Sequence, residues 1–303
     1  MNDSREGVSG QTTTLSYVLI TPARNEEATL EKTARSVTTQ TVLPSRWVVV
    51  SDGSTDRTDD IVLDYCSRHP WMGLIRLPEH EDRHFAAKVQ AFNAGLEALG
   101  GVGYDIIGNL DADISFGEDY FEFLLARLEE DPSLGVVGTP FVEDGATYDY
   151  RFTSSEHVSG ACQLFRRGCF EQIGGYVPIE GGGIDWTAVT TARMKGWRTR
   201  TFAQRVCQHH RKIGTGGGSS LGAWFRHGRK DYFLGGHPLW QLFRAAYQMK
   251  RRPYVLGGFL LLLGYTWAWV SRTARPVSRQ LVVFHRREQM GRLKGLLFRS
   301  GAT

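Results

Sequence analysis

The amino-acid sequence predicts an α/β protein, in which a mixed, largely parallel sheet is flanked by helices and followed by a separate helical region. Three features predict this fold class: short apolar strands alternate with helices, polar residues follow the ends of several strands, and the composition changes abruptly near residue 214. With 303 residues, of which 41% are hydrophobic, the chain is long enough for one large domain and an appendage.

Strands and helices are expected to alternate strictly from residue 15 to residue 110. This order predicts a parallel sheet with helices on both faces. In such sheets a ligand lies beyond the carboxyl ends of the strands. The expected strands comprise residues 15–20, 47–50, 74–77, 105–110, 136–139, 161–165 and 199–206, and the expected helices comprise residues 26–39, 59–67, 88–99, 118–130 and 185–195.

The chain divides into three predicted segments. Residues 1–14 are expected to be a disordered, polar N-terminus without the apolar core of a secretion signal. Residues 15–213 form the α/β domain, and the glycine-rich residues 214–220 open a tail that extends to residue 303. Four cysteines without C-x-x-C spacing are expected to be reduced thiols in a cytosolic setting; they are Cys66, Cys162, Cys169 and Cys207.

The sequence Asp111-Ala112-Asp113 directly follows an apolar strand. Side chains at alternate positions of an extended segment point the same way. Two such carboxylates repel each other unless a positive group lies between them. A hard divalent cation that also holds a diphosphate is the natural occupant, although a solvated loop with two acids is the simpler alternative.

Several motifs, in this order, resemble those of the family 2 inverting glycosyltransferases of GT-A fold. The resemblance covers about residues 15–212, so residues 15–213 are the expected catalytic domain. It implies a nucleoside-diphosphate sugar as donor and Mg²⁺ or Mn²⁺ as cofactor. The motifs are Thr-Pro-Ala-Arg-Asn-Glu-Glu at 21–27, Val-Val-Val-Ser-Asp-Gly-Ser-Thr-Asp at 48–56, Lys88 with Asn-Ala-Gly at 93–95, Leu-Asp-Ala-Asp at 110–113, Gly-Gly-Tyr at 174–176, and Asp185 followed by Gly-Trp-Arg at 196–198.

The resemblance assigns donor contacts to residues at the strand ends. It implies that Thr21, Ala23 and Glu27 line the nucleoside, that Asp52 contacts the base, and that Lys88 lies near the nucleotide or the diphosphate. Two simpler roles stay open: Asp52 as a turn former before a glycine, and Lys88 as a solvated lysine at a helix start.

The resemblance also divides the acidic residues by role. Asp113 is expected to coordinate the metal directly, and Asp111 to meet the ribose or a metal-bound water, so that the cation neutralises charge as the nucleoside diphosphate departs. Inversion needs a base for the acceptor hydroxyl, and Asp185 is the candidate. The family's Glu-Asp pair appears here as Ile184-Asp185. Asp185 as a mere N-cap of a helix beginning at Trp186 is the alternative.

Residues 208–212 echo the Gln-x-x-Arg-Trp segment of processive polysaccharide synthases. Lys212 replaces the tryptophan, which favours a non-processive enzyme. His210 is predicted as a third metal ligand or as a structural histidine, and Arg211 as a group that grips the diphosphate. The glycine-rich segment that follows is either a loop that closes over the donor or a linker. Residues 160–163 are expected to line the acceptor side or to pack.

The tail has a charge of opposite sign to the rest of the chain. Of 36 Lys and Arg and 32 Asp and Glu, residues 211–303 contain 17 of the former but two of the latter. Residues 254–270 carry no charge and as a helix would be roughly 25 Å long, slightly short of a ~30 Å hydrocarbon core. Basic residues flank both ends, which favours an in-plane or re-entrant membrane segment over a short span or a buried soluble helix.

The sequence therefore predicts a metal-dependent inverting glycosyltransferase at the cytoplasmic face of the cell membrane. Its acceptor is expected to be a glycan or a polyprenyl-linked sugar, in cell-surface polysaccharide or glycolipid synthesis. Nucleic acid is the weaker partner for the tail, because it requires no uncharged apolar segment. A catalytically inactive nucleotide-binding or membrane-scaffold relative is the alternative. A dinucleotide-dependent oxidoreductase is disfavoured, because the first strand–turn–helix lacks G-x-G-x-x-G.

Overall fold

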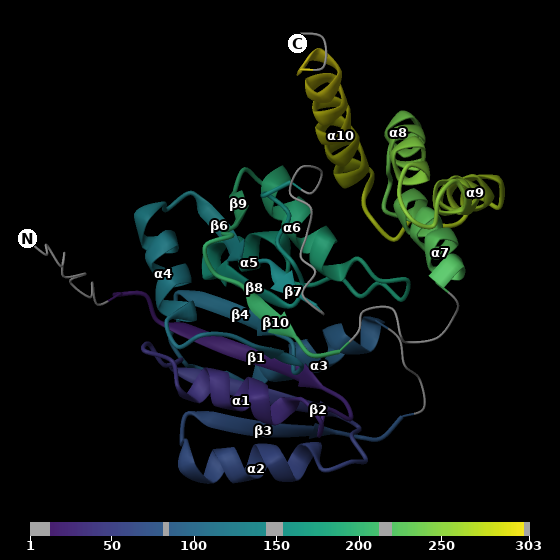
Figure 1. Cartoon of the computed structure of the whole chain (residues 1–303). Coiled ribbons are helices and arrows are strands. Elements are labelled where there is room, and N and C mark those ends of the chain that lie inside the picture. Colours follow the sequence, from purple (N-terminus) through teal and green to yellow (C-terminus); the bar gives the residue numbers. More distant parts are fainter. Residues whose placement is uncertain (1–12, 81–84, 144–153, 212–219, 300–303) are drawn as a thin grey trace, which may run out of the picture.

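The computed structural model describes residues 13–80, 85–143, 154–211 and 220–299. They form a sheet with helices on both faces, and further helices stand on one side of this domain (Figure 1). The predicted disordered N-terminus falls mostly outside the described residues. At its end, the hydroxyls of Thr13 and Thr14 donate hydrogen bonds to Glu129 Oε1, each at 2.9 Å, so these two residues are held to the domain.

The main sheet has seven strands in the order β3-β2-β1-β4-β8-β6-β9. Its first half is parallel, as predicted, because each of these strands is followed by a helix. β8 runs antiparallel to both of its neighbours and β9 is parallel to β6, so the sheet is mixed. The strands are β1 (Tyr17–Ala23), β2 (Arg46–Asp52), β3 (Met72–Leu77), β4 (Ile106–Leu110), β6 (Leu134–Gly138), β8 (Cys162–Arg166) and β9 (Arg198–Thr201).

Alternate residues of the central strands divide the core into two layers. Tyr17 and Leu19 of β1 face one buried cluster, and Val18 and Ile20 face the other, as the period of two along a strand requires. The first cluster includes α1 (Leu30–Thr38), α2 (Thr58–Arg68) and α4 (Tyr120–Glu130). The second includes α3 (Phe85–Ala98), α5 (Arg167–Ile173) and α6 (Ile184–Met194).

Three local differences from the predicted elements bear on the site. The helix predicted at 26–39 begins only at Leu30, because Asn25 adopts a positive φ of 54° and turns the chain. The helix α5 was not predicted. The strand predicted at 199–206 ends at Thr201, and the chain then enters a second sheet of order β5-β10-β7, made of β5 (Ile114–Ser115), β10 (Cys207–His209) and β7 (Phe141–Val142).

The C-terminal region consists of four helices, α7 (Ser220–Phe233), α8 (Pro238–Met249), α9 (Leu256–Val270) and α10 (Arg279–Arg299). Glycines let α7 and α9 approach closely: a Cβ added at Gly264 would lie 2.1 Å from the carbonyl oxygen of Phe225. α10 stands beside α6 (Figure 1). The two are joined by Arg193, whose guanidinium meets the Glu288 carboxylate at 2.7 and 3.1 Å.

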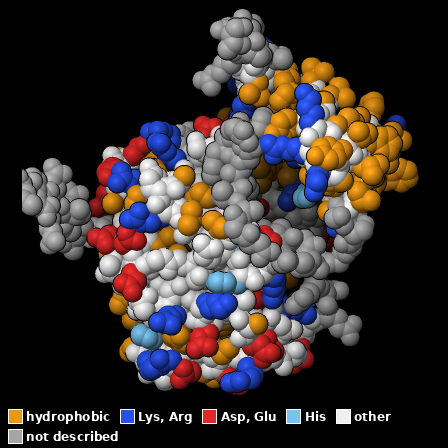
Figure 2. Space-filling view, viewed as in Figure 1, with side chains coloured by type: hydrophobic (Ala, Val, Ile, Leu, Met, Phe, Trp, Pro, Cys, Tyr) orange, Lys and Arg blue, Asp and Glu red, His pale blue; other side chains and the backbone are white. Residues whose placement is uncertain are grey.

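No helix within the described part of the chain is long and apolar enough to cross a membrane. α9 instead buries one face against its neighbours and exposes the other, where Phe259 is 53%, Trp267 59% and Val270 75% exposed. Figure 2 shows hydrophobic side chains gathered over the C-terminal helices, with Lys and Arg among them. The sequence analysis left open that residues 254–270 form a buried soluble helix; in the structure only the inner face of α9 is buried.

Candidate active site

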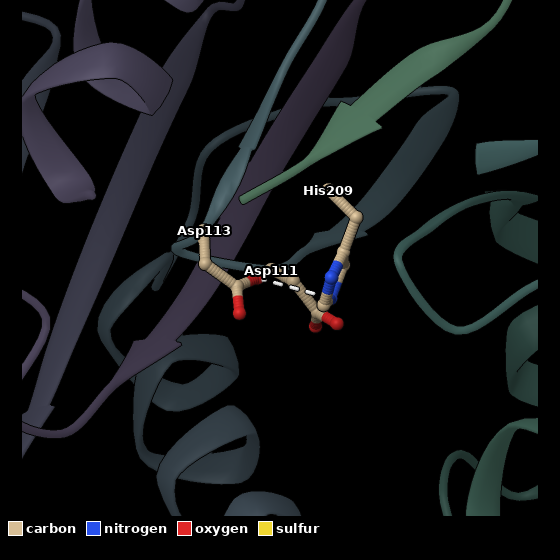
Figure 3. Close-up of side chains that lie close together, drawn as sticks. All are labelled: Asp111, Asp113 and His209. Carbon is tan, nitrogen blue, oxygen red and sulfur yellow. Dashed lines mark ion pairs between the residues drawn. The ribbon is translucent and has the colours of Figure 1, made fainter. Parts of the chain in front are cut away.

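A cluster of two acids and a histidine lies at the carboxyl edge of the sheet (Figure 3). Asp111 and Asp113 follow the end of β4, and His209 comes from β10 of the second sheet. One ligand atom of each residue lies within 4.8 Å of the others. Asp113 is buried, and the other two residues are half-buried. The structure thus brings together the two acids that the sequence singled out with a histidine from about 100 residues further along the chain.

The histidine of this cluster is His209, and not the predicted His210. β10 pairs with β5 so that His209 lies opposite Ile114. Successive side chains of a strand point to opposite faces, so this register aims His209 at the acids. His210 points elsewhere, and its Nε2 lies 2.8 Å from Ser115 Oγ. This register joins two short strands far apart in sequence, and the sequence contained no signal for it.

The donor set fits a divalent cation. The Nε2 of His209 lies 3.6 Å from Asp113 Oδ1, too far for a hydrogen bond, so the two groups face each other without satisfying one another. The Nδ1 of His209 is buried and has no hydrogen-bond partner among the described residues. Carboxylate and imidazole ligands together suit Mn²⁺-like divalent ions.

Lys88 lies at the start of α3 and forms an ion pair with Asp111. Burial alone would lower the pKa of Lys88, but the Asp111 carboxylate raises it above the ordinary lysine value, and Asp185 and Asp113 act in the same direction. Burial raises the pKa of Asp111, and Lys88 opposes that rise. The predicted position of Lys88 near the donor phosphates fits this ammonium, which stays charged beside the metal-binding acids.

Glu26 is a member of the site that the sequence analysis missed. It is buried in the turn before α1, and its Oε2 lies 2.9 Å from the guanidinium of Arg211. Burial raises its pKa to about 6, Arg211 lowers it, and Asp113 raises it again. Arg211, predicted to grip the diphosphate, is therefore held beside the acidic cluster by Glu26. The family resemblance assigned the donor contact to the adjacent Glu27, so the sequence analysis gave no role to Glu26.

Asp52 ends β2 and is 8% exposed. Its Oδ1 lies 2.9 Å from Nε2 of His80, whose Nδ1 lies 3.2 Å from the guanidinium of Arg24. The predicted base contact is thus an oriented carboxylate, and not only a turn former. His80 belongs to a segment without a recognisable motif, so its part in this chain of contacts became visible only in the fold.

The remaining predicted donor residues differ in exposure. Thr21 is fully buried, and its hydroxyl accepts a 2.9 Å hydrogen bond from the indole of Trp47, so its side chain packs in the core. Ala23 is 2% exposed and packs in the same core cluster. Glu27 is exposed, and its Oε2 accepts a hydrogen bond from the backbone N–H of Arg57. Thr21 and Ala23 belong to β1, whose side chains are mostly buried, whereas Glu27 lies in the turn that precedes α1.

Asp185 lies in the first turn of α6, close to the acidic cluster. The helix begins at Ile184, with Gly183 as its N-cap, so Asp185 is not the cap. A Cβ added at Gly160 would lie 3.1 Å from the Cβ of Asp185. The next residue, Ala161, accepts a 2.9 Å hydrogen bond from the backbone N–H of Asp111. One loop therefore separates the predicted base from the predicted metal ligands, and Gly160 makes room for Asp185.

The sheet order, the mixed strand directions and the acidic cluster at the strand ends agree with a GT-A-like fold. Residues 18–182 match the family described as Glycosyl transferase family 2. This match covers more than half of the 303 residues, and the chain belongs to that family.

One curated protein is similar to part of this chain in sequence, and two solved structures are similar to it in fold. The poly-β-1,6-N-acetyl-D-glucosamine synthase of Staphylococcus epidermidis is 24% identical over 136 residues, which are 45% of this chain but 31% of the synthase. The mannosyltransferase PcManGT of Pyrobaculum calidifontis, solved with GDP-Man and Mn²⁺, superposes with a TM-score of 0.56 at 21% identity, covering 90% of this chain and 79% of that one. Residues 1–349 of S. aureus TarS, solved with UDP-GlcNAc, give 0.55 at 15% identity, covering 86% and 74%.

Proposed function

We propose that this protein is a metal-dependent, inverting and non-processive glycosyltransferase. It transfers a sugar from a nucleoside diphosphate to a glycan or lipid-linked acceptor in the synthesis of a cell-surface polysaccharide or glycolipid. The observation that carries this proposal is the position of Asp185, one loop from the Asp111, Asp113 and His209 cluster. The relatives that bind GDP-Man and UDP-GlcNAc, and the poly-N-acetylglucosamine synthase, support the substrate class.

In the proposed reaction the acceptor hydroxyl oxygen forms a bond to the anomeric carbon of the donor sugar as the bond from that carbon to the diphosphate breaks. The electron pair of the broken bond leaves with the nucleoside diphosphate, and the hydroxyl proton passes to Asp185. Attack opposite the leaving group inverts the anomeric configuration. A bound Mg²⁺ or Mn²⁺ supplies positive charge at the departing diphosphate, and Asp111, Asp113 and His209 would hold it.

The donor side divides between the strand ends. Asp52 accepts a hydrogen bond from the base, at the position that His80 orients. Asp111 meets the ribose or a metal-bound water, and Lys88 and Arg211 present positive charge to the phosphates, which offsets the repulsion between the donor and the acids. Lys212, on which the non-processive assignment rests, lies outside the described residues.

We also propose that the C-terminal helices lie on the cytoplasmic face of the cell membrane. The outer face of α9 carries exposed apolar side chains at helical spacing: Leu256, Phe259, Leu263, Trp267 and Val270. Exposed basic side chains flank it, as an anionic lipid surface requires: Lys250, Arg252, Arg272, Arg275 and Arg279. The four free cysteines fit a reducing compartment.

Thermal melting with a panel of nucleotide-sugars, with and without Mn²⁺, tests the donor proposal. The right donor should stabilise the protein by about 2.7 kcal/mol at a hundred times its Kd, and Asp113→Asn should remove the Mn²⁺-dependent part. NAD should have no effect. Donor binding without Mn²⁺-dependent hydrolysis or transfer would favour the inactive relative, and stabilisation by NAD alone would contradict the proposal.

A further inference from the structure

A cavity of about 960 Å³ lies between α6 and the C-terminal helices. Asp185 and Trp186 of α6 line one side of it, and side chains of α7, α8 and α10 line the other. Leu261 of α9 also reaches the cavity, so the helix with the exposed apolar face contributes to its wall. The candidate base therefore lines an open cavity whose far wall is formed by the C-terminal helices.

One lysine of the cavity lining forms no ion pair with the described residues, although the lining also contains the carboxylate of Asp185. Three of the four Lys and Arg side chains of the cavity form ion pairs, which are Arg193 with Glu288, Arg244 with Asp231, and Arg292 with Glu156. The fourth, Lys230, has no ion-pair partner among the described residues. A half-buried ammonium without a counter-charge is a ready partner for an anionic ligand.

Lys230 lies next to the start of α6. A Cβ added at Gly183 would lie 3.2 Å from Cε of Lys230. Gly183 is the N-cap of α6 and precedes Asp185 by two residues. The helix N-terminus adds its own positive potential at this point. An anionic group held by Lys230 would therefore lie within the length of one sugar unit from the base.

Five Trp, Phe and Tyr side chains contribute to the walls of the cavity. Flat indole and phenyl surfaces pack against the apolar faces of sugar rings and apolar chains. The His285 ring packs edge-on against Trp186, with ring centroids 4.5 Å apart. Burial, followed by nearby guanidiniums, lowers the pKa of His285 to about 3, so this histidine stays neutral in a positive field. The aromatic side chains that line the cavity are Trp186, Trp224, Trp240, Phe243 and Tyr247.

We propose that this cavity binds the acceptor, and that the acceptor is a sugar carrying a phosphate or diphosphate group, which Lys230 holds while Asp185 faces the attacking hydroxyl. This inference rests on the proposed function, because it names the acceptor class of the same reaction. A neutral glycan would leave the ammonium of Lys230 without a partner. The contribution of α9 to the cavity wall gives a lipid attached to the phosphate a path toward the exposed apolar face.

Binding to the full-length protein, followed by the fluorescence of the cavity tryptophans, tests the acceptor class. The probes are the 1-phosphates of glucose, galactose, mannose and N-acetylglucosamine. Each 1-phosphate is compared with two derivatives of the same sugar: the neutral methyl glycoside, and the phosphodiester that carries a decyl chain. At least one phosphate form should bind roughly tenfold or more tightly than its neutral counterpart, as charged hydrogen bonds predict. A preference for the decyl form identifies a lipid-linked acceptor, and equal binding of both phosphate forms identifies a soluble one.

Lys230→Met should abolish the preference for phosphate, and Lys195→Met should retain it. Lys195 is an exposed lysine at the other end of α6 and serves as the matched control. Unchanged thermal melting and Mn²⁺-dependent nucleotide binding show that Lys230→Met is folded. Equal binding of charged and neutral probes to the wild type, or a preference that survives Lys230→Met, overturns the inference. If UDP and GDP bind normally in those experiments, the proposed function stands; if neither nucleotide binds, the proposed function itself fails.

Discussion

The α/β domain and the C-terminal helices differ in how much of their apolar side chains they bury. In the domain, two large clusters cover both faces of the sheet, and residues such as Leu19 and Ile20 are completely buried. The separate buried cluster of the C-terminal helices consists of Tyr232, Tyr265 and Ala268. A large, basic-rimmed apolar face marks an interaction surface. The domain therefore buries its apolar side chains in its own core, whereas α9 exposes an apolar face.

The same contrast appears in the charges. Around the donor site, cationic side chains are matched with acids, as in the Lys88–Asp111 and Arg211–Glu26 pairs. In the cavity beneath the C-terminal helices, Lys230 has no such match among the residues that the structure describes. The difference between the two regions is that the acidic cluster suits a cation, whereas Lys230 suits an anionic group. Under the proposals above, the two regions would bind two different substrates, and Asp185 would lie between them.

Asp185 should produce the largest effect, because it lies where the two regions meet. Asp185→Asn should reduce the rate of transfer by about 10²–10⁴-fold, the usual contribution of a general base, and leave the Kd for the nucleotide unchanged. Steady-state transfer assays and nucleotide titrations measure the two quantities. Asp60→Asn, an exposed acid in the first turn of α2, is the matched control and should retain full activity. Transfer by Asp185→Asn at the wild-type rate would remove Asp185 from the mechanism.

The exposed face of α9 should give the next largest effect. Leu263→Ser should weaken binding to vesicles that contain anionic lipid by about tenfold, since an inserted leucine contributes about 1.5–3 kcal/mol. Co-sedimentation with vesicles measures the loss, and nucleotide binding should not change. Leu63→Ser removes a leucine of similar exposure, 46% against 41%, from α2 of the domain. Equal losses in both variants, or none in Leu263→Ser, would show that α9 has no special affinity for lipid.

The smallest effect concerns Glu26, on the donor side of the comparison. Its pKa is raised in the folded state from 4.5 to about 6, chiefly by burial. Its contribution to stability is therefore fully present below pH 4.5 and is lost as the pH rises through 6. In the presence of EDTA, the free energy of unfolding of the wild type should change with pH by about 1 kcal/mol more than that of Glu26→Gln, a value that allows for solvent screening.

Urea unfolding between pH 4 and 7 measures the difference between the wild type and Glu26→Gln. Glu27→Gln changes the adjacent, exposed carboxylate and should retain the wild-type profile. If the profiles of wild type and Glu26→Gln are parallel throughout, the carboxylate of Glu26 titrates as it does in the unfolded chain.

The sequence by itself determined the parallel half of the sheet, the acids at its carboxyl edge and the position of Asp185 at the start of a helix. These features depend on local rules: strand and helix alternate, and strand ends meet at one edge. Asp111 and Asp113 were predicted to share a face of an extended segment, but they lie in the turn between β4 and β5 and are close together because they are two residues apart.

Only the tertiary structure decided which histidine faces the acids, which glutamate is buried and which cavity lysine forms no ion pair with the residues that the structure describes. His209 is chosen over His210 by the register of β10 on β5. Glu26 is buried by a turn at Asn25 and by Arg211, which follows it by 185 positions. Lys230 lies next to Gly183 because the C-terminal end of α7 reaches the start of α6. Each of these outcomes depends on contacts between distant segments, and a one-residue shift in any of them would present a different side chain.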